Sequence, residues 1–185
     1  MREDGRLTPP VSERDHLAGP DDAPVTLVEY GDYECPHCGR AHPVVKAVQR
    51  KMEGQLRFVF RNFPLAEAHP HALLAAQAAE AAGAQGRFWE MHDVIFEHQD
   101  ALEPEDIIGY AKGLGLDIAR FESELAAGTY AKKVRDDFRS GVKSGVNGTP
   151  TFFVNGVRYD GSWANEEAFI RALRAAAQHG VEAPA

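Results

Sequence analysis

The stretch of sequence that decides the fold reads VTLVEYGDYECPHC and covers residues 25–38. Its first part, residues 25–30, is β-branched and apolar apart from one acid, which predicts a buried strand. Cys35 and Cys38 follow, separated by a proline and a histidine. From the cysteines to about Gly54 the pattern is helical. We therefore expect a strand to give way to a helix at the cysteines.

The segments after this helix predict a βαβ unit followed by a helical block. Residues 56–60 alternate and are apolar, which predicts a second strand, with a right-handed crossover and parallel pairing as the default. Residues 71–142 place apolar side chains three and four positions apart almost throughout, which is typical of helices. This block lies between two regions that form strands.

Strand signals return near the C-terminus. Residues 151–154 and 157–159 are rich in β-branched and aromatic residues, and Asn155 and Gly156 lie between them. An Asn-Gly pair in this position predicts a tight hairpin, because both turn residues adopt positive φ. A final helix is expected from about Glu166.

Composition and charge exclude several classes of protein. The 185 residues are 44% hydrophobic and 26% charged, which is typical of a globular protein with one sizeable core. A net charge of -8, without a local basic cluster, argues against a nucleic-acid partner. No apolar run approaches the roughly 20 residues needed to span a bilayer, so we expect no membrane span.

The N-terminal residues also predict a location. Residues 1–6 lack the apolar segment of a secretory signal. We therefore expect a cytoplasmic protein if Met1 is the native start. Separately, we expect a monomer. Export, or a periplasmic location, is the alternative if a signal peptide has been removed.

The cysteine pair carries the chemistry. Two cysteines three positions apart cannot build a disulfide scaffold, and a disulfide that closes so short a loop stabilises the fold only a little. A cysteine at a helix start, with Pro36 in the first turn, has its sulfur beside unpaired N–H groups and the positive end of the helix dipole. His37 can add a positive charge. We therefore expect Cys35 to be a nucleophile of low pKa and Cys38 to be the resolving thiol.

The alternative for the cysteines is a zinc site completed by two histidines. The candidate ligands are His37, His42, His69 and His71. Structural zinc needs four fixed ligands, and no second CxxC or spaced histidine pair follows a known zinc-binding pattern, so we expect no metal. We expect His42 on the exposed face of the first helix, and the later histidines as surface or structural residues.

The string EYGDYECPHC, residues 29–38, resembles the active-site strand and helix start of DsbA-like thiol-disulfide oxidoreductases of the thioredoxin superfamily. Pro43 stands where members of that superfamily commonly kink the helix. Residues 148–151, GTPT, are similar to the family's cis-proline loop. The helical block matches the insertion that distinguishes DsbA-like proteins, and the resemblance covers roughly residues 16–178.

This resemblance implies an α/β thioredoxin fold, in which helices flank a central mixed β-sheet, with an inserted all-helical subdomain. Residues 24–66 and 144–180 would form the thioredoxin-fold domain, and residues 67–143 the insertion. Residues 1–23, rich in proline and charge, would be an N-terminal arm that is mobile or loosely docked.

The resemblance also implies disulfide exchange with protein or peptide thiols. Cys35, Cys38, Pro36 and His37 would carry the catalysis, with the Cys35–Cys38 disulfide as the redox group, no other cofactor, and a separate redox partner to recycle it. The net direction stays open, because Thr149 occurs before the cis-proline in both oxidases and isomerases. A reductase, an isomerase or a chaperone-like peptide-binding module is the alternative.

Three further residues receive roles from the resemblance. Glu29 would relay a proton to or from Cys38, since burial in an apolar strand should raise the pKa of its carboxyl; the alternative is a strand-edge residue facing water. Thr149 and Pro150 would lie next to Cys35, joined by a cis bond. Because Pro150 has no N–H, the backbone of Thr149 would remain available to an extended substrate.

Overall fold

The computed structural model describes residues 5–179, which form two compact units. The first unit runs to Tyr30 and adds Arg40–Arg61 and the chain from Ser140 onward; the second comprises Gly31–Gly39 and Asn62–Arg139. No helix among the described residues is long and apolar enough to cross a membrane.

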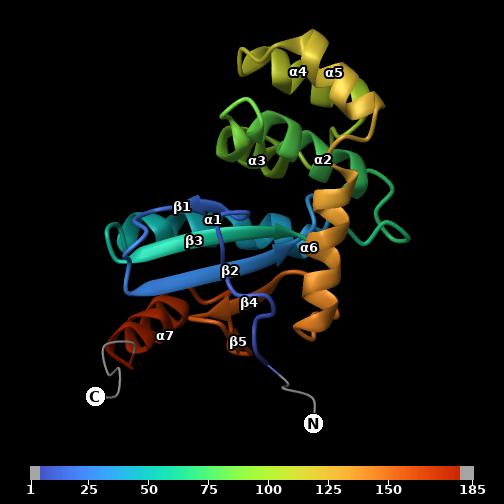
Figure 1. Ribbon diagram of the computed structural model, residues 1–185. Coiled ribbons are helices and arrows are strands. Elements are labelled where there is room, and N and C mark those ends of the chain that lie inside the picture. The colour runs from blue at the N-terminus through green and yellow to red at the C-terminus, as the bar shows by residue number, and fades with distance from the viewer. Residues whose placement is uncertain (1–4, 180–185) are drawn as a thin grey trace. The chain divides into compact units, whose positions relative to one another are not determined.

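The first unit is built on a five-stranded sheet in the order β1-β3-β2-β4-β5. The strands are β1 (His16–Ala18), β2 (Val25–Gly31), β3 (Leu56–Asn62), β4 (Thr151–Val154) and β5 (Val157–Tyr159). β1 is antiparallel to β3, and β4 is antiparallel to both β2 and β5. β2 and β3 point the same way in Figure 1. The expected mixed sheet is confirmed.

Helices cover the central strands. In β2 and β3 every residue is buried except Thr26 and Arg57, which are half-buried. Strands covered on both faces read as near-continuous apolar runs, as these do. Two helices, α1 (Pro36–Lys51) and α7 (Glu166–His179), also carry buried apolar residues, including Val45 and Leu173.

The predicted hairpin joins β4 to β5. Asn155 and Gly156 have φ values of 48° and 79°, which a tight two-residue turn requires. The Asn155 side chain also accepts a hydrogen bond from the Thr26 amide at 2.8 Å. The turn therefore ties the hairpin to β2 while it reverses the chain.

The second unit is helical, as the apolar spacing predicts. Its helices are α2 (Ala72–Gly83), α3 (Phe88–Glu97), α4 (Pro104–Gly113), α5 (Ile118–Ala126) and the first part of α6 (Ala131–Lys143). The buried side of α2 is almost entirely alanine, which favours the helix and leaves little side-chain volume between it and its neighbours. This unit includes residues 31–39, which the sequence-based division assigns to the thioredoxin-fold domain.

The N-terminal residues are attached to the sheet. β1 pairs with β3, the Leu7 amide donates to the Gly156 carbonyl at 2.9 Å, and the Arg158 amide donates to Gly5 at 2.7 Å. The expectation of a loosely docked arm is therefore wrong for residues 5–23, because main-chain bonds hold this segment at two places. Residues 1–4 lie outside the described residues.

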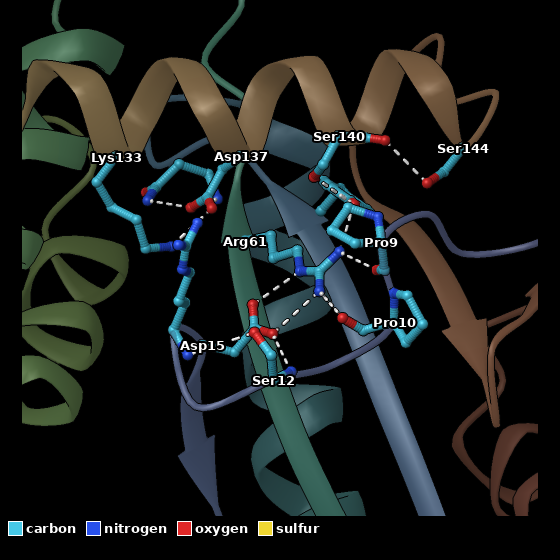
Figure 2. A network of polar contacts seen from close by, with 12 residues as sticks. Pro9, Pro10, Ser12, Asp15, Arg61, Lys133, Asp137, Ser140 and Ser144 are labelled. Carbon is cyan, nitrogen blue, oxygen red and sulfur yellow. Dashed lines mark hydrogen bonds and ion pairs between the residues drawn. The ribbon is translucent and has the colours of Figure 1, made fainter.

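A buried arginine also anchors this segment. The Arg61 guanidinium forms a two-pronged ion pair with Asp15, at 2.8 and 3.0 Å, and donates to the carbonyls of Pro9 and Pro10. It also donates to the Tyr30 hydroxyl at 3.0 Å. Figure 2 shows the guanidinium among these N-terminal partners. The strand alternation alone does not predict this charged side chain in the interior.

Candidate active site

The two cysteines lie at the start of α1. Cys35 directly precedes the helix, and its carbonyl accepts the first helical bond, from Gly39, at 3.0 Å. Both cysteines are buried; Cys35 is 4% exposed and Cys38 is 0% exposed. Pro36 and His37, between them, are exposed. Cys35 is therefore the slightly more exposed cysteine, beside N–H groups that have no partner within the helix.

Asp32 shapes the loop before the cysteines. Its main-chain N–H donates to Cys38 Sγ at 3.5 Å, and its carbonyl accepts from the Cys35 amide at 3.1 Å. Its carboxylate accepts from the amides of Glu34 and Leu65, both at 2.8 Å. This buried residue therefore contacts both cysteines through its backbone and folds the loop through its side chain.

Two carboxylate–histidine pairs involve residues just before the cysteines, and the same number of positions separates the two members of each pair. His69 Nδ1 lies 2.7 Å from Asp32 Oδ2, and His71 Nδ1 lies 2.8 Å from Glu34 Oε1; both pairs are separated by 37 positions. The His71 ring also contacts Glu103 at 3.1 Å. The hydrogen bond to Glu34 raises the pKa of His71, although partial burial opposes the shift.

Gln99 holds the backbone of the motif from the end of α3. Its Nε2 donates to the carbonyls of Tyr33 at 2.8 Å and Cys35 at 2.9 Å. The buried Tyr33 side chain is anchored separately, through a 3.0 Å hydrogen bond between its hydroxyl and His92 Nδ1. α3 therefore positions the residues that precede the helix start.

Gly39 leaves the space that the Gln99 side chain occupies. We therefore expect the effect of Gly39→Ala on the free energy of unfolding to change sign when Gln99 is removed. A Cβ at position 39 would lie 1.9 Å from Gln99 Oε1. We expect Gly39→Ala to displace Gln99 and lower the free energy of unfolding by about 1–2 kcal/mol. In a Gln99→Ala background the same change should raise it by up to about 1 kcal/mol, because alanine favours the helix. Urea melts of the four proteins measure both effects; destabilisation in both backgrounds would contradict this account.

The remaining predicted site residues belong to the sheet-containing unit. Glu29 lies in β2 opposite Phe152 and is 2% exposed, so the water-facing alternative is wrong. The Thr149–Pro150 bond is cis, and both residues are half-buried just before β4. Cys35, Pro36, His37 and Cys38 lie in the helical unit.

Sequence reasoning placed some histidines wrongly and missed several contacts. His42 is buried at 8% exposure rather than exposed on its helix. His69, expected as a surface or structural residue, is half-buried, and sequence reasoning missed its 2.7 Å contact with the Asp32 carboxylate. Asp32 and Glu34 have the same spacing as His69 and His71. This equal spacing is the sequence signal that could have indicated the two carboxylate–histidine pairs. Gln99 carries no comparable sequence signal.

Comparisons with known proteins identify the family of this chain. The family model described as Thioredoxin matches residues 11–173. Among curated relatives, Na(+)/H(+) antiporter NhaA 1 of Salinispora arenicola is 49% identical over 92% of this chain and 26% of its own length. A protein of the same name from Mycobacterium sp. strain KMS is 48% identical over 91% of this chain and 28% of its own. The chain thus spans about a quarter of the length of these relatives.

Solved structures show the same fold. BdbD from Bacillus subtilis is 26% identical, with a TM-score of 0.83 over 95% of this chain and 99% of its own. A thioredoxin-like oxidoreductase from Silicibacter pomeroyi is 25% identical, with a TM-score of 0.78 over 94% and 95%. α-DsbA1 from Wolbachia pipientis, at 21% identity and a TM-score of 0.78 over 93% and 94%, supports the fold alone. With its mixed sheet, helical unit and cysteine pair at a helix start, this chain belongs to the thioredoxin family and has the DsbA-like architecture.

Proposed function

We propose that this chain catalyses thiol–disulfide exchange with protein or peptide substrates. The observation that carries the proposal is the unequal setting of the two sulfurs: Cys35 keeps slight exposure at the start of α1, while Cys38 is fully buried. A thiolate at a helix start is stabilised by the helix dipole and by N–H groups. An accessible attacking thiol beside a sheltered resolving thiol suits a two-step exchange.

In the oxidising direction, a substrate thiolate attacks Cys35 of the Cys35–Cys38 disulfide. A bond forms between the substrate sulfur and Cys35, the bond to Cys38 breaks, and Cys38 leaves as a thiolate that takes up a proton. A second substrate thiolate then attacks the first substrate sulfur and releases Cys35 as a thiolate. The substrate loses two electrons and the cysteine pair gains them; the reverse sequence reduces a substrate disulfide.

Further residues keep the roles implied by the family. Pro36 and His37 separate the cysteines, and a protonated His37 would favour the Cys35 thiolate. Glu29 would exchange the proton of Cys38, and its burial in β2 supports this. Thr149 would bind the substrate main chain, since Pro150 has no N–H to compete. A separate redox partner would regenerate the disulfide.

Other activities are outcomes of the test rather than parts of the proposal. A reductase or isomerase would use the same cysteines in a different net direction, whereas a chaperone-like module would bind peptides without exchange. Ion transport is not proposed, because this chain matches only about a quarter of the relatives named as antiporters.

Equilibration with glutathione redox buffers tests the proposed exchange. We expect both cysteines to change state together at one two-electron midpoint, detected by a thiol-specific mass tag. A midpoint toward about −120 mV would indicate an oxidase, and one near about −270 mV a thioredoxin-like reductant. Glu29→Gln should alter the pH dependence of this equilibrium. Cysteines that stay unreactive or titrate separately would refute the proposal.

A further inference from the structure

Asp32 connects both cysteines to a residue outside the cysteine motif. Its backbone contacts the Cys38 sulfur at 3.5 Å and the Cys35 amide at 3.1 Å. Its carboxylate, fully buried, accepts a hydrogen bond from His69 Nδ1 at 2.7 Å. A single residue therefore separates His69 from the two thiols.

The Asp32 carboxylate needs a charged partner. Its two other side-chain contacts are the neutral amides of Glu34 and Leu65. A buried carboxylate is costly when it is not paired with a positive charge. Its negative charge would also oppose a thiolate at Cys35, because like charges at short range disfavour each other. His69 can supply the compensating positive charge.

Acidic groups around His69 favour its protonated form. Burial alone would lower the pKa of His69, but the hydrogen bond and charge of Asp32 raise it above its ordinary value. The negative charges of Cys35 and Glu34 act in the same direction. The side chain keeps 18% exposure, so it can exchange protons with solvent. Asp32, Cys35 and Glu34, each of which can carry a negative charge, thus all favour the His69 cation.

We propose that Asp32 and His69 form a positioning pair for the exchange site, in which the His69 cation offsets the Asp32 charge and thereby favours the Cys35 thiolate. This inference rests on the proposed function and deepens it. Asp32 holds the loop that precedes the cysteines. The charge of His69 determines how strongly the negative charge of Asp32 acts on the sulfurs. Neither residue forms a bond with the substrate.

The pair makes the reactivity of Cys35 depend on the charge of His69. Below the raised pKa of His69 the imidazolium is present and the thiolate is favoured. As pH rises through that pKa the cation is lost, and His69 no longer favours the Cys35 thiolate. A variant that keeps the hydrogen bond but lacks the charge should therefore differ from wild type at acidic and neutral pH and converge with it at alkaline pH.

His69→Gln provides this variant, because the glutamine amide can still donate to Asp32. Two readouts are measured across pH on the full chain: the alkylation rate of Cys35 by iodoacetamide in the reduced protein, and the equilibrium constant with glutathione. We expect alkylation to slow by about tenfold at pH values below the pKa of Cys35, where the thiolate is the minor form. A tenfold change in the redox equilibrium toward the disulfide would lower the midpoint by about 30 mV.

His98→Gln is the matched control. His98 is exposed, and its Nδ1 lies 2.9 Å from the Val94 carbonyl in its own helix. We expect its alkylation profile and midpoint to match those of wild type. An equal shift in both variants, or none in His69→Gln, would overturn the proposal.

A double-mutant cycle separates charge compensation from simple support of the loop. In an Asp32→Asn background the charge that His69 offsets is gone, so His69→Gln should change the alkylation rate less than twofold. A full tenfold effect in that background would overturn the pairing. Alkylation does not require exchange activity, so a shifted alkylation profile without turnover would refute the proposed function and leave the pair intact.

Discussion

Replacement of Cys35 by serine is expected to abolish disulfide exchange, with a rate loss of about 1000-fold or more, which corresponds to about 4 kcal/mol of transition-state stabilisation. The reason is chemical, since a serine hydroxyl is neither a thiolate nor able to form a disulfide. The side chains have similar size, so the buried helix start should persist. A dithiol peptide substrate and mass spectrometry of its products measure the loss.

Cys38→Ser is the matched control for this result. It leaves Cys35 able to attack but removes the resolving thiol, so a mixed disulfide between Cys35 and the substrate should accumulate. Turnover then stops for a different reason, which the trapped adduct reveals. If Cys35→Ser kept full activity toward unfolded chains, a peptide-binding chaperone would replace the enzyme. An adduct on Cys38 in place of Cys35 would reverse the assigned roles.

Replacement of Arg61 by methionine is expected to lower the free energy of unfolding by about 3–5 kcal/mol. The Asp15 side chain is only 5% exposed and would lose its charged partner. Two proline carbonyls would lose their donor as well. Burial alone would lower the pKa of Arg61, but the bonds to Asp15 and Tyr30 raise it above its ordinary value, so the guanidinium stays charged.

An exposed ion pair supplies the comparison for Arg61. Lys51 is 57% exposed where it pairs with Glu166, and Lys51→Met should change the free energy of unfolding by less than about 1 kcal/mol. Adding Asp15→Ala to Arg61→Met should recover part of the loss, because no stranded charge remains. Urea melts of the reduced proteins measure all three effects. Equal losses in the two methionine variants would contradict the anchoring role.

Some features follow from short stretches of sequence. Residues 25–30 predict a buried strand because β-branched residues pack well on a pleated surface. Asn155 and Gly156 predict their hairpin because the turn depends on the φ preferences of two adjacent residues. The position of Cys35 at a helix start follows from the strand before it and the proline after it.

Other features depend on partners that are distant in sequence. Arg61 interrupts an apolar strand, and its burial depends on Asp15, which lies 46 positions earlier. The prediction of an exposed His42 is wrong because the spacing of apolar residues along one helix does not show which of its sides other elements cover. Gln99 reaches the motif from 64 residues beyond Cys35. No local periodicity encodes such pairings.

The sequence by itself determined the strand–cysteine–helix motif, the hairpin and the helical character of residues 71–142, because each depends on interactions within a few turns or adjacent strands. Only the tertiary structure decided which charges meet at the cysteines. The pairing of Asp32 with His69 depends on how residues 62–71 fold back to Gly31 and Asp32, through the Phe63–Gly31 and Leu65–Asp32 hydrogen bonds. Electrostatic effects act through space, so the setting of the thiols follows from the folded chain rather than from the motif alone.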